Sequence, residues 1–210
     1  MSRKTRIAVL VSGGGTNLQA LIDAQQRGEL GGGEIAAVIS TKEGAFALER
    51  AARAGIPGCV VPRKAYASNQ AMTVAMVEKL RELDVQLVVL AGCMVIFTSE
   101  LVEAYPNAIM NVHPALIPSF CGKGFYGLHV HEAALAYGVK LSGATVHFVS
   151  EECDGGPIIA QKAVAVLEND TPETLQRRIM EEAEWKVLPE AVSLFCQGRL
   201  TVEGRKVVIR

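Results

Sequence analysis

The sequence predicts an α/β protein built on an open, mostly parallel, Rossmann-like sheet with helices on both faces. Apolar runs of strand length alternate with helix-like patterns through the first half of the chain, which is typical of βαβ units. Several of these runs are apolar on nearly both sides, as strands are when helices cover both faces of a parallel sheet. Two strand-like segments later follow each other directly, so we expect the sheet to become mixed near its C-terminal edge.

The first half of the chain supplies the alternating elements. The runs expected to form parallel strands are 7–11, 35–39, a short one from Val60, 85–90 and 107–112. Helices are expected between them, because the intervening apolar residues recur at helical spacing. These patterns are Leu18, Leu21 and Ile22, an alanine-rich segment at 45–54, and Met72, Met76, Val77 and Leu80.

The second half of the chain no longer alternates between predicted strands and helices. Segments 142–150 and 157–166 are expected to be consecutive strands. Thr171 then precedes Pro172 and Glu173, the pattern of an N-cap residue, a proline in the first turn and an early acid. We expect this helix to run to about Cys196 with a bend near Pro189. With no repeat and no long linker, we expect one catalytic domain over residues 1–210.

Composition excludes several classes of protein. The 210 residues carry 21 Lys and Arg against 22 Asp and Glu, a net charge of −1, so we expect no electrostatic binding to nucleic acid or anionic membrane. No apolar stretch reaches the length of roughly 18–20 residues that spans a bilayer, and the first apolar run is too short for a signal peptide. Five scattered cysteines without a CxxC pair favour neither disulfides nor zinc. We therefore expect a soluble, cytoplasmic protein without a metal.

A glycine-rich turn, Ser12-Gly13-Gly14-Gly15-Thr16-Asn17, joins the first strand to the first helix. Leu18 stands where a dinucleotide-binding GxGxxG pattern needs its third glycine, and Ser40-Thr41-Lys42 stands where that pattern needs an acid. The Walker pattern fails as well. Two interpretations remain: a pocket for a single phosphate, with Thr16 and Asn17 as donors at a helix N-terminus, or a tight turn in which Thr16 or Asn17 caps the helix.

Asn111 and His113 lie at the end of an expected strand that Pro114 terminates. Alternation directs both side chains to one side, roughly 6–7 Å apart, at the sheet edge where such folds bind ligands. An amide that donates to an oxyanion beside an imidazole that moves protons is a catalytic pair; the alternative is a turn that bonds its own loop. Asp154 in Asp-Gly-Gly-Pro is either a turn residue or, if it lies near His113, a carboxylate that raises the imidazole pKa. His129, His131 and His147 are weaker candidates.

Taken together, these motifs resemble the glycinamide ribonucleotide (GAR) formyltransferases over residues 7 to about 200. The resemblance rests on five segments in matching order: 12–17, Leu-Ala-Gly-Cys-Met at 90–94, Asn-Val-His-Pro-Ala-Leu-Ile-Pro at 111–118, Gly-Ala-Thr-Val-His-Phe at 143–148 and Asp-Gly-Gly-Pro at 154–157. It implies the formyltransferase fold and transfer of a formyl group from 10-formyltetrahydrofolate, as co-substrate, to the amino group of GAR in purine synthesis. It implies no metal, and it leaves a monomer or a homodimer open.

The resemblance also implies roles for individual residues. Asn111, His113 and Asp154 match the catalytic trio. Gly15, Thr16 and Asn17 match the positions that hold the GAR phosphate, and Glu184 matches a ribose contact. The folate-binding positions are Met94, Val95, Ile96 and Phe97, together with Asn111.

This chain departs from the family pattern in two places. Relatives often carry arginine within 94–97 and near position 69, where this chain has Val95 and Asn69, so backbone contacts are expected to hold the folate there. The loop at 119–127 is longer than in many relatives and contains three glycines, which suggests a mobile lid from which Lys123 reaches a phosphate.

Other functions remain as alternatives. A formyltetrahydrofolate hydrolase, or a formyltransferase with another amine acceptor, would share the formyl-folate site. Methionyl-tRNA formyltransferase and the hydrolase are disfavoured because each would need a further domain. A nucleotide-binding or redox module that uses only the glycine turn is disfavoured by the failed dinucleotide pattern.

Overall fold

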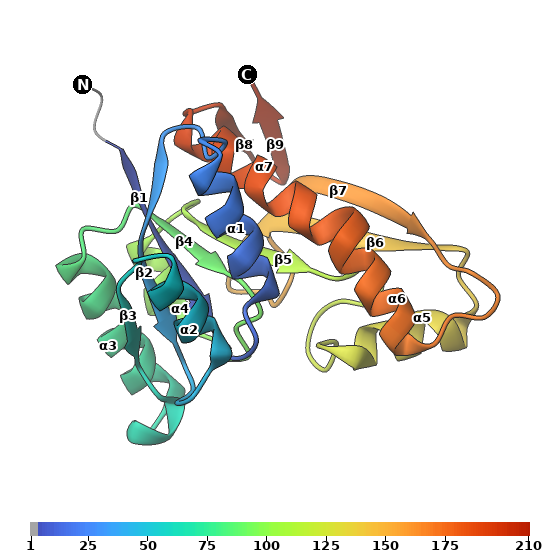
Figure 1. The fold of residues 1–210 in the computed structure, drawn as a ribbon, viewed down its shortest axis with the longest axis horizontal. Helices are drawn as coiled ribbons and strands as arrows, with labels where there is room; N and C mark the ends of the chain where they lie inside the picture. Colours follow the sequence, from blue (N-terminus) through green and yellow to red (C-terminus); the bar gives the residue numbers. More distant parts are fainter. Residues whose placement is uncertain (1–3) are drawn as a thin grey trace.

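The computed structural model describes residues 4–210, and one mixed sheet runs through them (Figure 1). Within this range the strands are ordered β3-β2-β1-β4-β5-β6-β7-β9-β8. Strands β1 to β5 are parallel to one another, whereas β6 is antiparallel to both β5 and β7. The bounds are β1 (Thr5–Val11), β2 (Gly33–Ser40), β3 (Gly58–Val60), β4 (Leu87–Leu90), β5 (Ile109–His113), β6 (Leu141–Phe148), β7 (Ile158–Ala165), β8 (Leu200–Glu203) and β9 (Lys206–Ile209).

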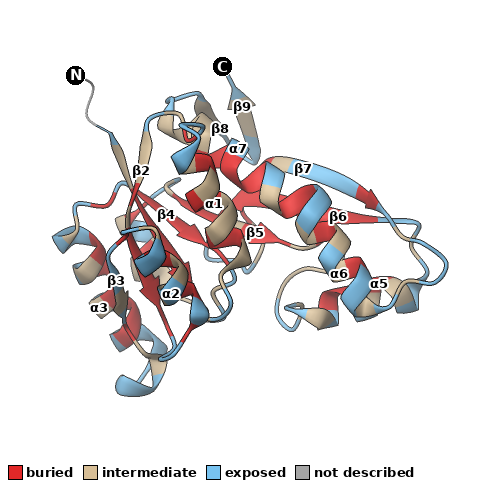
Figure 2. Cartoon of the chain, in the orientation of Figure 1, coloured by how far each residue is buried: buried red, intermediate tan, exposed pale blue. Residues whose placement is uncertain are grey.

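Helices cover both faces of the sheet, as the sequence predicts. Alternate residues of β1 enter two different cores: Ile7 and Val9 pack with α1, α2 and α7, while Ala8 and Leu10 pack with α3 and α4. Figure 2 shows the buried residues concentrated along the central strands and the inward helix faces. The helices are α1 (Thr16–Gln26), α2 (Phe46–Arg53), α3 (Asn69–Glu82), α4 (Ser99–Ala104), α5 (Leu128–Tyr137), α6 (Pro172–Ile179) and α7 (Trp185–Cys196).

The C-terminal helical segment differs from the prediction. A capping box at Thr171 starts α6, as expected, but the α-helical pattern is interrupted by a π-helical turn at Met180–Glu184 and not at Pro189, which lies inside α7. The extra residue of a π turn rotates the side chains that follow it, and such turns are frequent at functional sites. Here the turn buries Ala183 and Glu184.

The sequence analysis missed three further elements: α4, α5 and the C-terminal hairpin. The hairpin joins β8 to β9 through Gly204 and Arg205, and Gly204 has φ 62°. A two-residue turn that contains glycine between apolar runs is a recognisable hairpin signal. The short α4 and the buried face of α5 offer no comparable periodic pattern.

Loops converge where the strand order reverses between β1 and β4. Ser12, after β1, accepts a hydrogen bond at its Oγ from the Met94 backbone N–H (2.8 Å) and shares another with the Thr41 hydroxyl (2.6 Å). The backbone N–H of Ser12 also donates to the carbonyl of Gly92 at 3.2 Å. The loops after β1, β2 and β4 are therefore joined at the crevice where open α/β sheets bind ligands.

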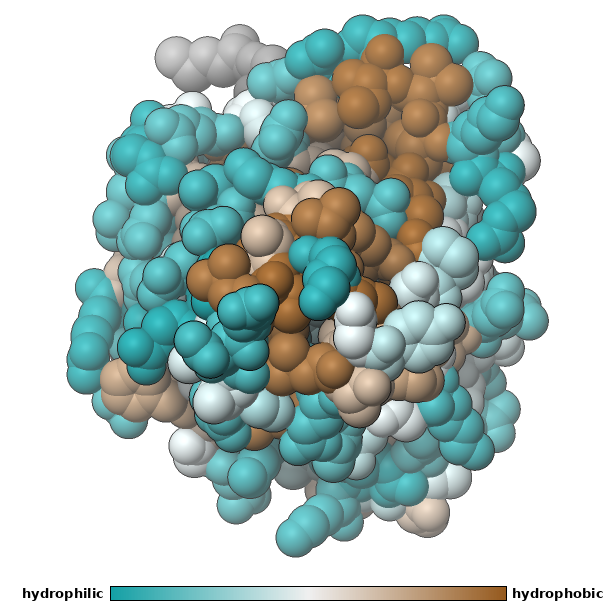
Figure 3. Space-filling view, turned by 90° about the vertical axis from the view of Figure 1, so that its right-hand side faces the viewer, coloured by the Kyte–Doolittle hydropathy of each residue, from teal (hydrophilic) through white to brown (hydrophobic). Residues whose placement is uncertain are grey.

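Helices α5 and α6 lie at one end of the molecule, with the start of β6 and the end of β7, on the right-hand side of Figure 1. Figure 3 shows that apolar side chains gather near the middle and upper part of this face, within a mostly hydrophilic surface. Leu141 at the start of β6 and Leu167 after β7 are more than half exposed.

In residues 4–210 no helix has the length and apolar character needed to cross a membrane.

Gly15 sets the geometry of the glycine turn. It is the N-cap residue of α1 and has φ 72°, and a Cβ built there would lie 2.6 Å from the Cβ of Ala47. Only glycine combines this left-handed backbone with such close approach to α2. At Gly14 a Cβ would meet no atom within 4 Å.

We therefore expect Gly15→Ala to lower the free energy of unfolding by about 1–3 kcal/mol, because it adds left-handed strain and a clash. Gly14→Ala is the matched control and should stay within about 0.5 kcal/mol of wild type. Urea unfolding without ligand measures both. Equal stability of the two variants would show that α2 does not constrain the turn.

Candidate active site

The connection between β6 and β7 places Asp154 at the centre of the site. Asp154 has φ 55°, a left-handed conformation that aspartate tolerates better than most residues. At Gly156 a Cβ would lie 1.7 Å from the carbonyl oxygen of Phe148, so the chain passes against the end of β6. This close approach returns the Asp154 carboxylate over the sheet.

Asn111 and His113 project from β5 toward this carboxylate. The Asn111 Nδ2 is 3.4 Å from Asp154 Oδ1, and the His113 Nδ1 is 3.6 Å from Asp154 Oδ2. The structure therefore brings together the three residues that were predicted as a catalytic trio. The side chain of His113 is only 5% exposed and that of Asp154 11%, so their charges interact largely out of water.

His147 also belongs to this cluster, although the sequence analysis treated it as a weak candidate. It pairs with Asn111 across β5 and β6. Its Nδ1 donates to the Phe148 carbonyl (2.9 Å), so its Nε2 is free to accept from Asn111 Nδ2 at 3.1 Å. This bond orients the amide with its N–H groups toward Asp154. Had the pairing of Asn111 with His147 across two strands been known, it would have identified His147 as a residue of the site.

Backbone groups of the 119–127 loop complete the site. The Gly122 N–H donates to Asp154 Oδ2 at 2.8 Å, and the carbonyl of Phe120 accepts from His113 Nε2 at 2.8 Å. Because a carbonyl only accepts, neutral His113 carries its proton on Nε2 and turns the lone pair of Nδ1 toward Asp154. Sequence reasoning cannot find such contacts, because they involve main-chain atoms of a loop.

Asp154 raises the pKa of His113, as predicted, but it does not set the direction of the net shift. Burial lowers the pKa of His113, and this effect outweighs the nearby Asp154 and the bond to Phe120, which raise it. For Asp154 the balance is reversed. Burial would raise its pKa, but His147, which donates to the carboxylate only when it is protonated, the Gly122 N–H and the nearby His113 hold the pKa below its usual value. The resting pair is therefore a neutral imidazole beside a carboxylate.

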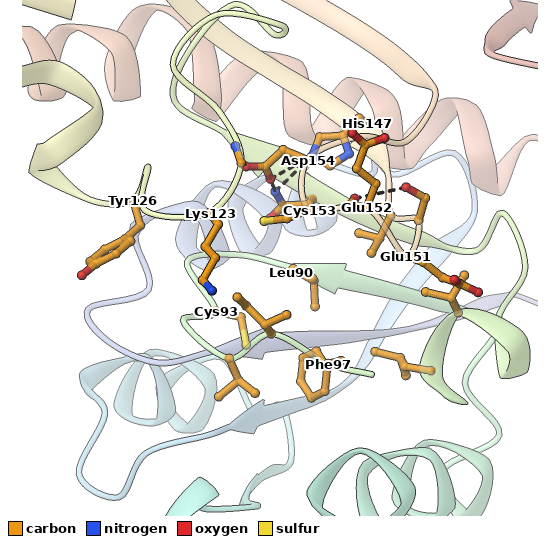
Figure 4. A pocket seen from close by; sticks show the side chains of 18 of the residues that line it. Leu90, Cys93, Phe97, Lys123, Tyr126, His147, Glu151, Glu152, Cys153 and Asp154 are labelled. Carbon is orange, nitrogen blue, oxygen red and sulfur yellow. Dashed lines mark hydrogen bonds and ion pairs between the residues drawn. The ribbon is translucent and has the colours of Figure 1, made fainter. Parts of the chain in front are cut away.

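A cavity of about 610 Å³ opens beside the trio. Asn111, His147 and Asp154 form one wall, and the predicted folate segment 94–97 forms the wall across from it (Figure 4). Leu90, Leu101, Val102 and Val149 make the interior apolar. A largely apolar cavity with a few polar groups at one side is typical of a small-molecule site.

The structure also places the two residues that depart from the family pattern. Asn69 donates from Nδ2 to the carbonyl of Ile96 at 3.3 Å and accepts from Arg63, so it braces the backbone of the folate segment. Val95 is half-buried and packs against the core formed with α3 and α4. Lys123 lies on the wall of the large cavity, whose lining contains none of residues 13–17.

The glycine turn and the π turn meet in a second cluster. Gly15 is the N-cap of α1 and no side chain of residues 4–210 caps this helix, so the alternative interpretation, in which Thr16 or Asn17 caps it, is wrong. Asn17 instead donates from Nδ2 to Glu184 Oε2 at 2.6 Å, and its buried Oδ1 has no hydrogen-bond partner among residues 4–210. Thr16 contacts Met180 Sδ at 3.7 Å. The first N–H groups of α1 are thus left for an anion.

Glu184 is the most perturbed carboxyl near this cluster. Glu184 is only 6% exposed. Burial raises the pKa of Glu184 to about 7, against the opposing effect of the hydrogen bond from Asn17. A carboxyl that titrates near neutrality can accept or donate hydrogen bonds to a polar ligand.

Comparison with known proteins agrees with this geometry. Residues 5–192 match the formyl transferase family model. The chain is 41% identical over 199 residues to the chloroplastic phosphoribosylglycinamide formyltransferase of Arabidopsis thaliana, covering 94% of this chain and 68% of the relative. It is 40% identical to phosphoribosylglycinamide formyltransferase of Haemophilus influenzae, covering 94% of this chain and 90% of that one. The chain belongs to the formyl transferase family.

Solved structures show the same relationship. Glycinamide ribonucleotide transformylase 1 from Symbiobacterium toebii superposes with a TM-score of 0.93 at 46% identity, covering 100% of this chain and 95% of that one. A formyltetrahydrofolate deformylase from Pseudomonas syringae is more distant, with a TM-score of 0.88 at 29% identity, and this chain covers 66% of it.

We expect Glu184→Gln to change how stability depends on pH. Because the folded-state pKa lies above the usual 4.5, the folded wild type binds more protons, and its unfolding free energy falls as pH rises from 4.5 to 7. This loss is on the order of 3 kcal/mol in total. Glutamine cannot ionise, so the variant should lack it.

Urea unfolding at several pH values measures the difference between the two proteins. Glu132→Gln, at an exposed residue of α5, is the control and should follow wild type. Parallel pH profiles for Glu184→Gln and wild type would contradict the raised pKa.

Proposed function

We propose that this chain transfers the formyl group of 10-formyltetrahydrofolate to the amino group of GAR, giving formyl-GAR and tetrahydrofolate. The observation that carries the proposal is the Asp154 carboxylate, which lies beside both Asn111 and His113 at the wall of the large cavity. Family membership and the names of the relatives supply the substrates. A single sheet that includes all the strands of residues 4–210 supports one catalytic domain.

The acceptor is proposed to bind at the glycine turn. A phosphate would accept hydrogen bonds from the free N–H groups of Gly15, Thr16 and Asn17 at the start of α1, where the helix dipole also favours an anion. Glu184, bonded to Asn17, would contact the ribose hydroxyls. Because Ser12 is hydrogen-bonded to Gly92 and Met94, the glycine turn lies beside the loop that lines the cavity. The amine of a GAR molecule bound at this turn would therefore lie close to the cavity.

The folate is proposed to occupy the large cavity. Its flat pteridine ring would lie among the apolar side chains, with its edge facing the backbone of Met94, Val95, Ile96 and Phe97. Asn111 would then face the formyl group. The brace from Asn69 to Ile96 would hold this backbone in place without an arginine side chain.

Attack of the neutral amine on the formyl carbon gives a tetrahedral intermediate with one anionic oxygen. Asn111 is set to stabilise it. One of its N–H groups is held by His147 at 3.1 Å, while the other makes only a long contact of 3.4 Å to Asp154 and is available to the oxyanion. Preorganised donors of this kind stabilise transition states strongly, because they need no reorientation during the reaction.

His113 would carry the proton from one nitrogen to the other. His113 Nδ1 lies 3.6 Å from Asp154 Oδ2, which is too long for a hydrogen bond. The lone pair of Nδ1 is therefore available to accept a proton from the attacking amine. Nδ1 takes this proton, and Asp154 stabilises the resulting imidazolium. The proton then passes to N10 of the folate as the bond between the formyl carbon and N10 breaks and the oxyanion returns to a carbonyl.

Formyl transfer followed by folate absorbance tests the proposal. We expect turnover with GAR and none with water alone, and we expect His113→Ala to lower kcat by about 10²–10⁴-fold, the usual contribution of a general acid–base group. Lys140→Ala, at an exposed residue outside the cavity, is the control. Turnover without GAR would instead identify a hydrolase, and turnover only with another amine would identify a different acceptor.

The lowered pKa of His113 predicts the acid limb of the pH profile. Since the imidazole must be neutral to accept the proton, kcat/KM should fall at low pH with a midpoint below the usual 6.5 of histidine. Asp154→Asn removes a charge that raises this pKa, so its residual activity should titrate at still lower pH. A midpoint above that of wild type in Asp154→Asn would contradict the assignment.

A further inference from the structure

Among the described residues that line the large cavity, Lys123 is the one lysine, and no arginine lines it. Lys123 follows Gly122, whose N–H is held by Asp154, and the Gly122 carbonyl accepts from the Phe125 N–H at 3.1 Å. Lys123 and Gly124 therefore occupy the middle of a tight turn that is fixed to the catalytic carboxylate. Figure 4 shows the side chain reaching into the cavity toward Cys93.

The charges around the cavity are separated. Glu151 and Glu152 lie on the side opposite Lys123 (Figure 4). Within residues 4–210 no carboxylate lies within 4 Å of the Lys123 ammonium. A ligand that fills the cavity is therefore favoured if it presents N–H donors at one end and an anion at the other.

Exposed apolar side chains lie on the cavity wall. Met94, Ile96 and Tyr126 line it and are 55%, 59% and 51% exposed. The Tyr126 ring packs edge-on against His129 with centroids 5.2 Å apart, which holds it beside the turn that carries Lys123. Apolar and aromatic surface next to a cation suits a flat aromatic ring that carries a carboxylate.

We propose that Lys123 binds the glutamyl carboxylate of the folate co-substrate, with Tyr126 and Met94 contacting the neighbouring p-aminobenzoyl ring. This inference rests on the proposed function and adds a specificity residue to it. A folate matches the cavity along its whole length: the pteridine ring has N–H donors, the benzoyl ring is flat and apolar, and the glutamyl end is anionic.

The phosphate of GAR is the other anion that Lys123 could contact, as the sequence analysis expected. The structure favours the folate, because the cavity that Lys123 lines also contains the 94–97 segment and none of the glycine-turn residues 13–17. The start of α1 already offers the phosphate its own N–H groups.

Calorimetric titration with tetrahydrofolate and with tetrahydropteroyl amide, in which an uncharged carboxamide replaces the glutamyl group, tests the proposal. Lys123→Gln should weaken tetrahydrofolate binding about two- to fivefold, the size expected for one partly exposed ion pair, and should leave binding of the uncharged amide unchanged. Lys123→Arg should restore most of the affinity. Lys140→Gln removes an exposed lysine outside the cavity and should behave as wild type.

Kinetics provides the second readout. In Lys123→Gln the KM for 10-formyltetrahydrofolate should rise by the same factor, with kcat and the KM for GAR unchanged. Three results would overturn the proposal while leaving formyl transfer intact. Lys123→Gln could weaken binding of both folates equally, weaken binding of neither, or raise only the KM for GAR. If wild type binds neither folate, the proposed function fails and this inference fails with it.

Discussion

The site depends on the contacts of the Asp154 carboxylate, a side chain that is only 11% exposed. The carboxylate accepts from the Gly122 N–H at 2.8 Å and contacts Asn111 and His113, so it joins β5, the β6–β7 connection and the 119–127 loop. Its position requires a left-handed backbone at 154 and the close approach of Gly156 to the end of β6. Each contact depends on the sheet pairing beneath it, and the 119–127 loop in turn depends on Asp154.

Burial and charge act in opposite directions on this pair, and the outcome differs for its two members. For His113, burial prevails and favours the neutral imidazole. For Asp154, hydrogen bonds prevail and favour the carboxylate. Environments that push two neighbouring groups to different protonation states assign them different roles in catalysis. Here His113 receives the proton, and Asp154 stabilises the cation that results.

Much of this arrangement is predictable from the sequence, because it follows from local patterns. The apolar runs predict the strands, and alternation along β5 places Asn111 and His113 on one side. The contact with Asp154 is not predictable in this way, since it depends on the return of a distant loop. The net direction of the His113 pKa shift was not predictable, because a sequence does not report burial. The π turn that buries Glu184 was missed because Pro189 offered a more obvious place for a break.

Titration of the His113 imidazole followed by ¹⁵N NMR tests the central claim most directly, since it reports the protonation state and the tautomer of one ring in the free protein. We expect a neutral ring protonated on Nε2, with a pKa below the usual 6.5, and a further decrease of this pKa in Asp154→Asn. A ring protonated on Nδ1, or a pKa above 6.5 that Asp154→Asn does not change, would contradict the claim.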